Sequence, residues 1–446
     1  MRTLFTDIDY LSSDFTIAHG SVVVEDTSIV YVGAEDPPKS GQEPSSLVGQ
    51  IDRRDLVNTI SGKGRLLIPG LYNLHTHIPM TLLRGYAEGL ALDEWLNTRV
   101  FPFEAQIAPA AALPASELAI AEMLRFGTVA FSDMYNFSAE RIQAVAASGI
   151  KANISYGPVA FDPETRYEDL PAKIEVAQLV HEHHNSLDGR LRIDIFIHSE
   201  YLSNQHIVRS VVQQAQELGV GTHIHLSETQ KEHEECKQRH AGLTPAAYFD
   251  SLGFFKVPCT AAHCVWTEPT DWQIMAAHGV SVAHNPASNA KLGSGFAPIA
   301  RMMDSGITVG LGTDSVASNN NHNLFKDIYL AALLDKGAQR DPVLVSPTQA
   351  LRAATIAGAR AQGRERCGRI EVGARADLVL LNVDVPWMQP VHDQLNNLVY
   401  SAQGSDVILT MVDGEVLYSN GEWKTIDVER AAYETSRATD KILAAL

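Results

Sequence analysis

Several histidines of this sequence stand near the ends of short apolar segments, where their side chains could bind a metal ion or transfer protons. His75 and His77 close the segment 65–77, and His225 precedes Glu228 by three residues at the end of the segment 219–228. If these segments are β-strands, residues two apart point to the same face, so His75 and His77 project together. An unpaired imidazole is costly to bury, which favours a functional use of this pair.

Other segments end in residues of the same kind, namely His198, His263, His284 and Asp314. The sequence holds 17 histidines and three His-x-His pairs, so one such pair would mean little by itself. The pair His181 and His183 lies in a helix-like stretch and is expected on a polar helix surface. The prediction of a metal or proton-transfer site therefore depends on the positions of these residues at the segment ends, and the number of histidines does not support it.

Eight apolar or β-branched segments recur through the middle of the chain, at 65–77, 127–134, 151–158, 191–200, 219–228, 258–264, 279–285 and 306–314. Helix-like stretches separate them, and many end in glycine, the usual signal for the end of a helix. This alternation predicts a (β/α)₈ TIM barrel, whose active site lies at the C-terminal ends of the strands. Six of the eight segments would then bring a titratable or metal-binding residue to one rim.

The two ends of the chain are rich in strand-like segments and turns. Examples are 28–33 near the N-terminus and 375–383 and 406–418 near the C-terminus, the last with a hairpin signal at Asp413-Gly414. We therefore expect a small β-sandwich domain built from 1–64 and 367–446, with the C-terminal helix included. The barrel domain would comprise 65–366.

Composition narrows the partners and the compartment. The 446 residues include 53 acidic and 35 basic ones, a net charge of −18, which argues against binding a nucleic-acid backbone. The four cysteines show no C-x-x-C spacing, and no run of 18 apolar residues predicts a membrane span. The N-terminal segment lacks the apolar core of a secretory signal. We expect a cytoplasmic protein with free thiols that binds neither nucleic acid nor membrane.

Five motifs in order resemble the amidohydrolase superfamily: IPGLYNLHTHIPMTLLRG, HIHLSETQKEH, AAHCVW, AHNPASNAKLGSG and LGTDSVASNNN. The sequence is most similar to the 5′-methylthioadenosine/S-adenosylhomocysteine deaminase family, and GRIEVGARADLVLLN extends the resemblance toward the C-terminus. The resemblance implies hydrolytic deamination of an adenine nucleoside to the inosine analogue and ammonia. It also implies one divalent metal ion per subunit, zinc or alternatively Fe²⁺, and a homo-oligomer, dimeric or tetrameric.

Matching motifs imply a role for each residue at the rim. The metal ligands would be His75, His77, His225 and Asp314, a set that suits zinc. Glu228 would shuttle protons to the ring nitrogen beside the carbon under attack and then to the leaving ammonia. His263 would orient the attacking water, and Asp314 would also accept its proton.

The same resemblance implies where the nucleoside is held. Glu104 would bind the ribose hydroxyls, His198 would contact the nucleoside, and Trp95 would form part of the pocket wall.

Two departures from the family pattern concern the substrate. Glu200 replaces a proline that is frequent in relatives, and it faces either the pocket or solvent. Arg166 and Lys173 are the available cations for the carboxylate of S-adenosylhomocysteine, and neither aligns clearly with the arginines of relatives. Methylthioadenosine, 5′-deoxyadenosine or adenosine are therefore at least as good candidates.

Two alternatives remain open from the sequence. Guanine deaminases and s-triazine hydrolases share the scaffold, and they would not use Glu104 and His198 to hold a ribose. An inactive binding protein on the same fold is the alternative of a different class, and the complete ligand set argues against it.

Overall fold

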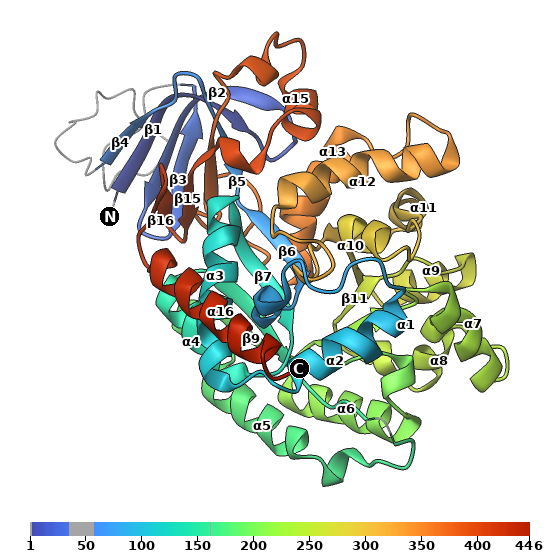
Figure 1. Ribbon diagram of the computed structural model, residues 1–446. Helices are drawn as coiled ribbons and strands as arrows, with labels where there is room; N and C mark the ends of the chain where they lie inside the picture. The colour runs from blue at the N-terminus through green and yellow to red at the C-terminus, as the bar shows by residue number, and fades with distance from the viewer. Residues whose placement is uncertain (1, 35–57, 161) are drawn as a thin grey trace.

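The computed structural model describes residues 2–34, 58–160 and 162–446. It contains a closed parallel barrel and a separate mixed β-sheet, so the predicted barrel and terminal β-structure are confirmed (Figure 1). The sheet and the barrel lie side by side. Residues 35–57 of the predicted terminal domain lie outside the described residues, and the boundaries of the two domains stay a prediction.

Eight strands close the barrel in the order β10-β11-β12-β13-β6-β7-β8-β9. They are β6 (Leu71–Thr76), β7 (Thr128–Met134), β8 (Lys151–Tyr156), β9 (Leu191–Ile197), β10 (Thr222–Leu226), β11 (Cys259–His263), β12 (Ser281–His284) and β13 (Thr308–Leu311). Each coincides with one of the eight segments expected from the sequence. Most residues of these strands are buried, because helices cover the outer face of the barrel while side chains fill its interior.

Helices surround the barrel and bury their apolar faces against it. The main ones are α3 (Pro109–Arg125), α4 (Ser138–Ser148), α5 (Pro171–His183), α6 (Gln205–Leu218), α7 (Gln230–Arg239), α8 (Pro245–Ser251), α9 (Pro269–Ala277), α10 (Pro286–Lys291), α11 (Ile299–Asp304), α12 (Leu324–Gln339), α13 (Pro347–Arg352) and α14 (Gly358–Ala361). Helices α4 and α6 end at Gly149 and Gly219 in the left-handed conformation, as the glycine signal predicted. No single described helix is long and apolar enough to cross a bilayer, although the bent pair 92–104 and 109–125 passes that test jointly.

The mixed sheet has nine strands drawn from both ends of the described chain. They are β1 (Arg2–Leu11), β2 (Ile17–Glu25), β3 (Ser28–Gly33), β4 (Asn58–Ser61), β5 (Arg65–Pro69), β14 (Leu378–Asn382), β15 (Val407–Val412), β16 (Glu415–Ser419) and β17 (Glu422–Trp423). Antiparallel pairing of β5 with β14 joins the two ends. The expected Asp413-Gly414 hairpin connects β15 to β16, with φ of 48° and 81° at its two residues.

The predicted segment 65–77 is two strands rather than one. Strand β5 belongs to the mixed sheet and β6 to the barrel, and the chain passes between them at Gly70. A Cβ at Gly70 would lie 2.3 Å from a methyl carbon of Val129, so only glycine allows this close approach. Apolar periodicity continues through both strands, which is why the break does not show in the sequence.

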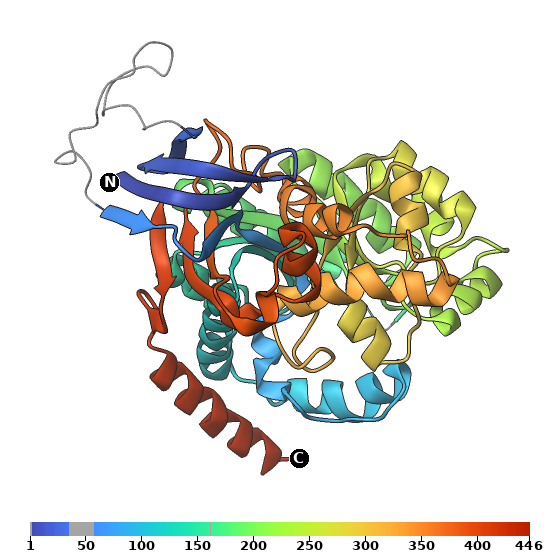
Figure 2. The same cartoon turned by 90° about the horizontal axis from the view of Figure 1, so that it is seen from above.

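Two further segments lie near the rim that carries the chemistry. A long connection between β6 and α3 contains η2 (Ile78–Leu83), α1 (Leu92–Trp95), η3 (Leu96–Val100) and α2 (Phe101–Glu104). The last long helix, α16 (Val428–Leu443), packs against α3. It lies at the outer edge of the molecule and ends at the C-terminus (Figure 2). Thr439 of α16 also donates a hydrogen bond to the carbonyl of Leu82 in η2.

Candidate active site

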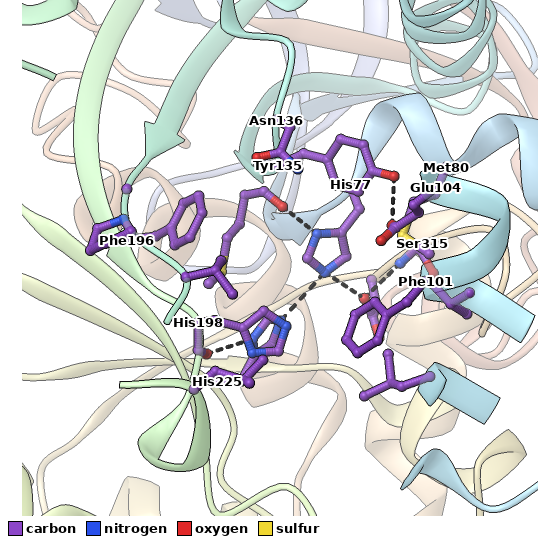
Figure 3. Close-up of a pocket in the computed structure, with 18 of the residues that line it drawn as sticks. His77, Met80, Phe101, Glu104, Tyr135, Asn136, Phe196, His198, His225 and Ser315 are labelled. Carbon is purple, nitrogen blue, oxygen red and sulfur yellow. Dashed lines mark hydrogen bonds and ion pairs between the residues drawn. The ribbon is translucent and has the colours of Figure 1, made fainter. Parts of the chain in front are cut away.

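A cavity of about 540 Å³ opens at the C-terminal ends of the barrel strands. Its lining includes His77, His198, His225, His263, Glu228 and Asp314 from these strand ends, together with Trp95 and Glu104 from the connection after β6. The volume is in the range typical of small-molecule sites. Figure 3 shows His77 between Tyr135 on one side and His225 on the other, with Glu104 beside Tyr135.

Three histidines and one aspartate converge at the floor of this cavity. Asp314 Oδ1 lies 3.2 Å from His77 Nε2 and 3.6 Å from His75 Nε2. His225 Nε2 lies 3.4 Å from His77 Nε2. The four residues come from β6, β10 and the end of β13, so the closure of the barrel brings together groups that are far apart in the sequence.

Hydrogen bonds at the outer nitrogen of each ring fix which way the ring faces. His225 Nδ1 lies 2.8 Å from the carbonyl oxygen of His198, and His77 Nδ1 contacts the carbonyl oxygen of Met134. A carbonyl only accepts, so each Nδ1 carries a proton, and each Nε2 is the ring atom directed at the centre of the cluster. Metal-binding histidines are held in the same way, through the ring nitrogen that does not face the metal.

His75 is held by another histidine, His223, which the sequence analysis did not assign. His75 Nδ1 lies 3.0 Å from His223 Nε2, and His223 Nδ1 lies 3.4 Å from Ser155 Oγ. His75 Nε2 is buried without a hydrogen-bond partner. The sequence does contain a signal, because His223 and His225 form a His-x-His pair like the one at His75 and His77.

Asp314 is oriented by hydroxyl groups that were also missed. Its Oδ2 accepts hydrogen bonds from Ser288 Oγ at 2.6 Å and Ser318 Oγ at 3.0 Å. Its Oδ1, which faces the histidines, accepts one from the backbone N–H of Ser315 at 2.7 Å. The backbone of Asp314 has φ of 60° and that of His263 has φ of 72°. Left-handed residues at strand ends cost energy and occur where a side chain must be aimed at a site.

The electrostatics of this cluster suit a cation. Burial lowers the pKa of His75 and of His225 well below that of a free histidine, which keeps both rings neutral. Burial by itself would raise the pKa of Asp314. The hydrogen bond and the charge interaction with His77 are the main opposing effects, and the pKa of Asp314 is lowered overall. Two overlapping groups of possible ligand atoms occur here, His75 with His77 and His225, and His75 with His263 and Asp314.

The donor set therefore fits a divalent metal ion. Neutral imidazole nitrogens and one carboxylate are ligands that zinc prefers. The buried, unpartnered Nε2 of His75 would otherwise carry the full cost of desolvation.

Glu228 and His263 lie beside the histidine–aspartate cluster formed by His75, His77, His225 and Asp314. Glu228 Oε2 is 3.9 Å from His263 Nε2, and His263 Nδ1 is 2.8 Å from Asn289 Oδ1. Burial raises the pKa of Glu228, opposed by the charge of His263. A glutamate whose pKa is raised toward neutrality can both hold and release a proton within a reaction cycle.

A second buried glutamate supports Glu228 from behind. The carboxylate of Glu232, on α7, accepts the backbone N–H groups of Ser227 at 3.0 Å and Glu228 at 2.7 Å. Burial raises the pKa of Glu232 to about 8. This contact fixes the turn that carries Glu228 past the end of β10. The sequence alone offered no reason to prefer Glu232 over the other acidic residues of its helix.

The residues expected to hold a nucleoside also line the cavity. Glu104 Oε1 accepts a hydrogen bond of 2.6 Å from the hydroxyl of Tyr135, and burial raises the pKa of Glu104. His198 is half-buried, and desolvation lowers its pKa to about 3, so it is a neutral ring. Trp95 is buried among apolar side chains of the connection after β6 and forms part of the wall.

A protein-family model described as "Amidohydrolase family" matches residues 66–417 of this chain. The chain belongs to the amidohydrolase family. The superfamily resemblance carried by the motifs is therefore confirmed. In this amidohydrolase the matched residues include every barrel strand and every residue of the histidine–aspartate cluster.

Curated relatives of this amidohydrolase have deaminase names. A 5-methylthioadenosine/S-adenosylhomocysteine deaminase of Dictyoglomus thermophilum is 43% identical over 86% of this chain and 89% of the relative. A 5′-deoxyadenosine deaminase of Methanosarcina acetivorans is 37% identical over 96% of this chain and 94% of the relative. The crystal structure of an adenosine deaminase from Xanthomonas campestris with bound zinc has a TM-score of 0.90 and 29% identity, covering 99% of this chain and 98% of that one.

Several residues singled out from the sequence of this amidohydrolase lie elsewhere. Glu200 is buried and pairs with Arg239 at 2.5 Å and His240 at 2.6 Å, so it faces neither the cavity nor solvent. Lys173 pairs with Glu168 at 3.6 Å on the outer side of α5. Arg166 is exposed and does not line the cavity. His284 is buried beside a separate small cavity rather than the main one.

Proposed function

We propose that this amidohydrolase is a zinc-dependent hydrolytic deaminase that converts adenine nucleosides to the inosine analogues and ammonia. The observation that carries the proposal is the arrangement of the cavity. A histidine–aspartate cluster forms its floor, Glu228 lies beside that cluster, and Glu104 lies on the wall. The deaminase names of relatives at 37–43% identity over most of the chain support the same reaction.

One divalent ion per subunit would be held by His75, His77, His225 and Asp314. Zinc is the favoured metal because the ligands are mainly neutral imidazoles, and Fe²⁺ is the alternative. When bound, such an ion supplies the Lewis acidity that lets water attack a ring carbon near neutral pH. The zinc named with the Xanthomonas structure supports this choice.

The chain's own acids and bases would carry the protons. Burial raises the pKa of Glu228, so its carboxyl group is protonated at a higher pH than that of a free glutamate. It can therefore donate a proton to the ring nitrogen beside the amino-bearing carbon. The two protons of the attacking water would balance the transfers: one passes from Asp314 through Glu228 to the departing ammonia, and the other restores the proton that Glu228 gave to the ring nitrogen. His263, fixed by Asn289, would orient the attacking water, and Asp314 would accept its proton.

The ribose would lie against the wall formed by Glu104 and Tyr135. The carboxylate of Glu104 can accept hydrogen bonds from two adjacent hydroxyls, because it already receives only one from Tyr135. His198 would contact the nucleoside as a neutral ring, and Trp95 would close the wall. The base would then extend from the ribose toward Glu228 and the metal-binding cluster.

A substrate panel tests the reaction. We expect adenosine, 5′-methylthioadenosine and 5′-deoxyadenosine to lose their amino group, measured by the change from adenine to hypoxanthine absorbance and by ammonia release. Turnover of guanine or an s-triazine, with no turnover of any adenosine, would replace this proposal by the alternative hydrolases. Absence of both stoichiometric metal and deamination would favour an inactive binding protein.

Replacement of Glu104 by Gln should weaken ribose binding more than chemistry. We expect KM for 5′-deoxyadenosine to rise about 10- to 100-fold, the range for losing hydrogen bonds to a charged group. The 2′,3′-dideoxy analogue lacks the hydroxyls, so its KM should change little in the same variant. The exposed Glu94, on α1, provides the matched control as Glu94→Gln. An equal effect on both substrates would contradict a ribose contact.

We also propose a cytoplasmic homo-oligomer. All four cysteines are buried free thiols, as expected for a reducing compartment. The dimeric or tetrameric state stays a prediction from the family resemblance. The absence of nucleic-acid and membrane partners stays a prediction from the net charge and from the lack of a long apolar run.

A further inference from the structure

The charged groups that line the cavity are all acidic among the described residues. Four carboxylates line it, those of Glu104, Glu175, Glu228 and Asp314, and the described lining contains no lysine or arginine. Three of these four belong to the floor or the ribose wall described above. The fourth, Glu175, lies on α5 and has no part in the proposed reaction.

Glu175 stands in a wall that is otherwise mainly apolar. This wall is formed after β8 and β9 and by the start of α5, and its side chains include Val159, Leu170, Ala172, Phe196 and Leu202. The side chain of Tyr156 also lines it, and burial together with a hydrogen bond to Glu175 raises the pKa of the Tyr156 hydroxyl to about 12. Within the described parts of the chain, Glu175 forms no ion pair.

Three cations of the surrounding elements are paired with other carboxylates, and Arg166, in the connection before α5, is exposed and does not line the cavity. Lys173 is directed to Glu168 on the outer side of α5, and Arg239 is paired with Glu200. Arg141 is fully buried with its charge paired to Asp133 at 2.8 Å. Each of these charges is therefore already used away from the cavity.

We infer from the proposed position of the substrate that this wall contacts the 5′ end of the nucleoside. If the base reaches the metal-binding cluster and the ribose hydroxyls reach Glu104, the wall that contains Glu175 is free to receive the substituent on the 5′ carbon. An apolar surface suits an uncharged 5′ group. A carboxylate there would lose its water without gaining a cation, and it would also be repelled by Glu175.

We propose that the cavity selects nucleosides whose 5′ substituent carries no net negative charge, and that Glu175 is the residue that excludes such a charge. This inference rests on the proposed deaminase function. It places compounds such as 5′-methylthioadenosine and 5′-deoxyadenosine inside the substrate range. It does not exclude S-adenosylhomocysteine, because the amino-acid end of that compound carries an ammonium group beside its carboxylate.

Two probes of nearly equal size isolate the carboxylate. They are 5′-S-(2-carboxyethyl)-5′-thioadenosine and its neutral amide, 5′-S-(2-carbamoylethyl)-5′-thioadenosine. For the metal-loaded wild type we expect kcat/KM to favour the amide by about 30-fold or more, within the range that an unpaired buried charge produces. Glu175→Gln should lower the ratio of the two kcat/KM values, amide over carboxylate, about 10-fold. Glu182→Gln, an equivalent change at an exposed site on the same helix, should keep the wild-type ratio.

Each outcome decides the inference. A wild-type ratio near one would overturn the exclusion of carboxylates. A large wild-type ratio that Glu175→Gln leaves unchanged would overturn the assignment to Glu175. Because both probes are measured on one protein sample, partial misfolding of a variant cancels from the ratio.

Binding measurements separate this inference from the proposed function. Calorimetry with the same probes on metal-loaded Glu228→Gln measures the ratio of the two Kd values without turnover. If the wild type deaminates no adenosine but the binding ratio persists, the deaminase proposal fails and the carboxylate selection stands. If neither probe binds, both fail.

Discussion

Glu228→Gln should lower kcat by roughly two to four orders of magnitude, the usual contribution of a positioned acid–base group. The amide keeps the size of the side chain, but it cannot hold and release a proton. Glu228 suits proton transfer better than an exposed glutamate does, because burial raises the pKa of its carboxyl group. The measurement is kcat with 5′-methylthioadenosine, alongside the metal content of the same sample.

Glu234→Gln serves as a control for an effect on helix α7, which begins just after Glu228. Glu234, on α7, is exposed and pairs only with Lys237, at 3.7 Å, among the described residues. Glu234→Gln should leave kcat near the wild-type value. Retention of a tenth or more of wild-type activity by Glu228→Gln, with metal bound, would rule out its assigned role. Loss of metal from that variant would instead place Glu228 among the groups that hold the ion.

His77→Ala should deplete the protein of metal and abolish deamination. The ring of His77 contacts both Asp314 Oδ1 and His225 Nε2, so its removal deletes a central donor rather than a peripheral one. Loss of one ligand from a four-ligand set leaves the ion poorly coordinated. Elemental analysis should find about one ion per subunit in the wild type and well under half of that in the variant.

Two further variants sharpen this test. His75→Ala should also lose metal, but it removes the partner of His223 as well, so it should lower the melting temperature more than His77→Ala does. His181→Ala, on the surface of α5, should change neither metal content nor activity. A full complement of metal in both His75→Ala and His77→Ala would show that the ion, if present, is held elsewhere.

The sequence was enough to predict the barrel and the residues at its rim. The barrel was predictable because apolar segments and glycine-terminated helical stretches are local patterns, which can be recognised in the sequence without the structure. The pair His75 and His77 is predictable for the same reason, since residues two apart on a strand must share a face. The position of Gly70 was not recognised as a junction, because β5 and β6 have the same apolar character although they belong to different sheets.

The partners of these residues depended on the tertiary structure. His75 and His223 are separated by 148 positions, and Glu200 and Arg239 by 39, so neither pairing follows from a local pattern. Glu200 was expected to face the pocket or solvent, and it does neither, because Arg239 and His240 of another helix end neutralise it.

The sequence by itself determined which residue types stand at the strand ends, and so the class of chemistry. Only the tertiary structure decided which ring nitrogens face the centre, through the carbonyls of Met134 and His198. It also decided the charge of the cavity, since Lys173 turns outward while Glu175 of the same helix lines the wall. Strand periodicity is local, whereas side-chain direction and charge pairing depend on neighbours brought together only when the barrel closes.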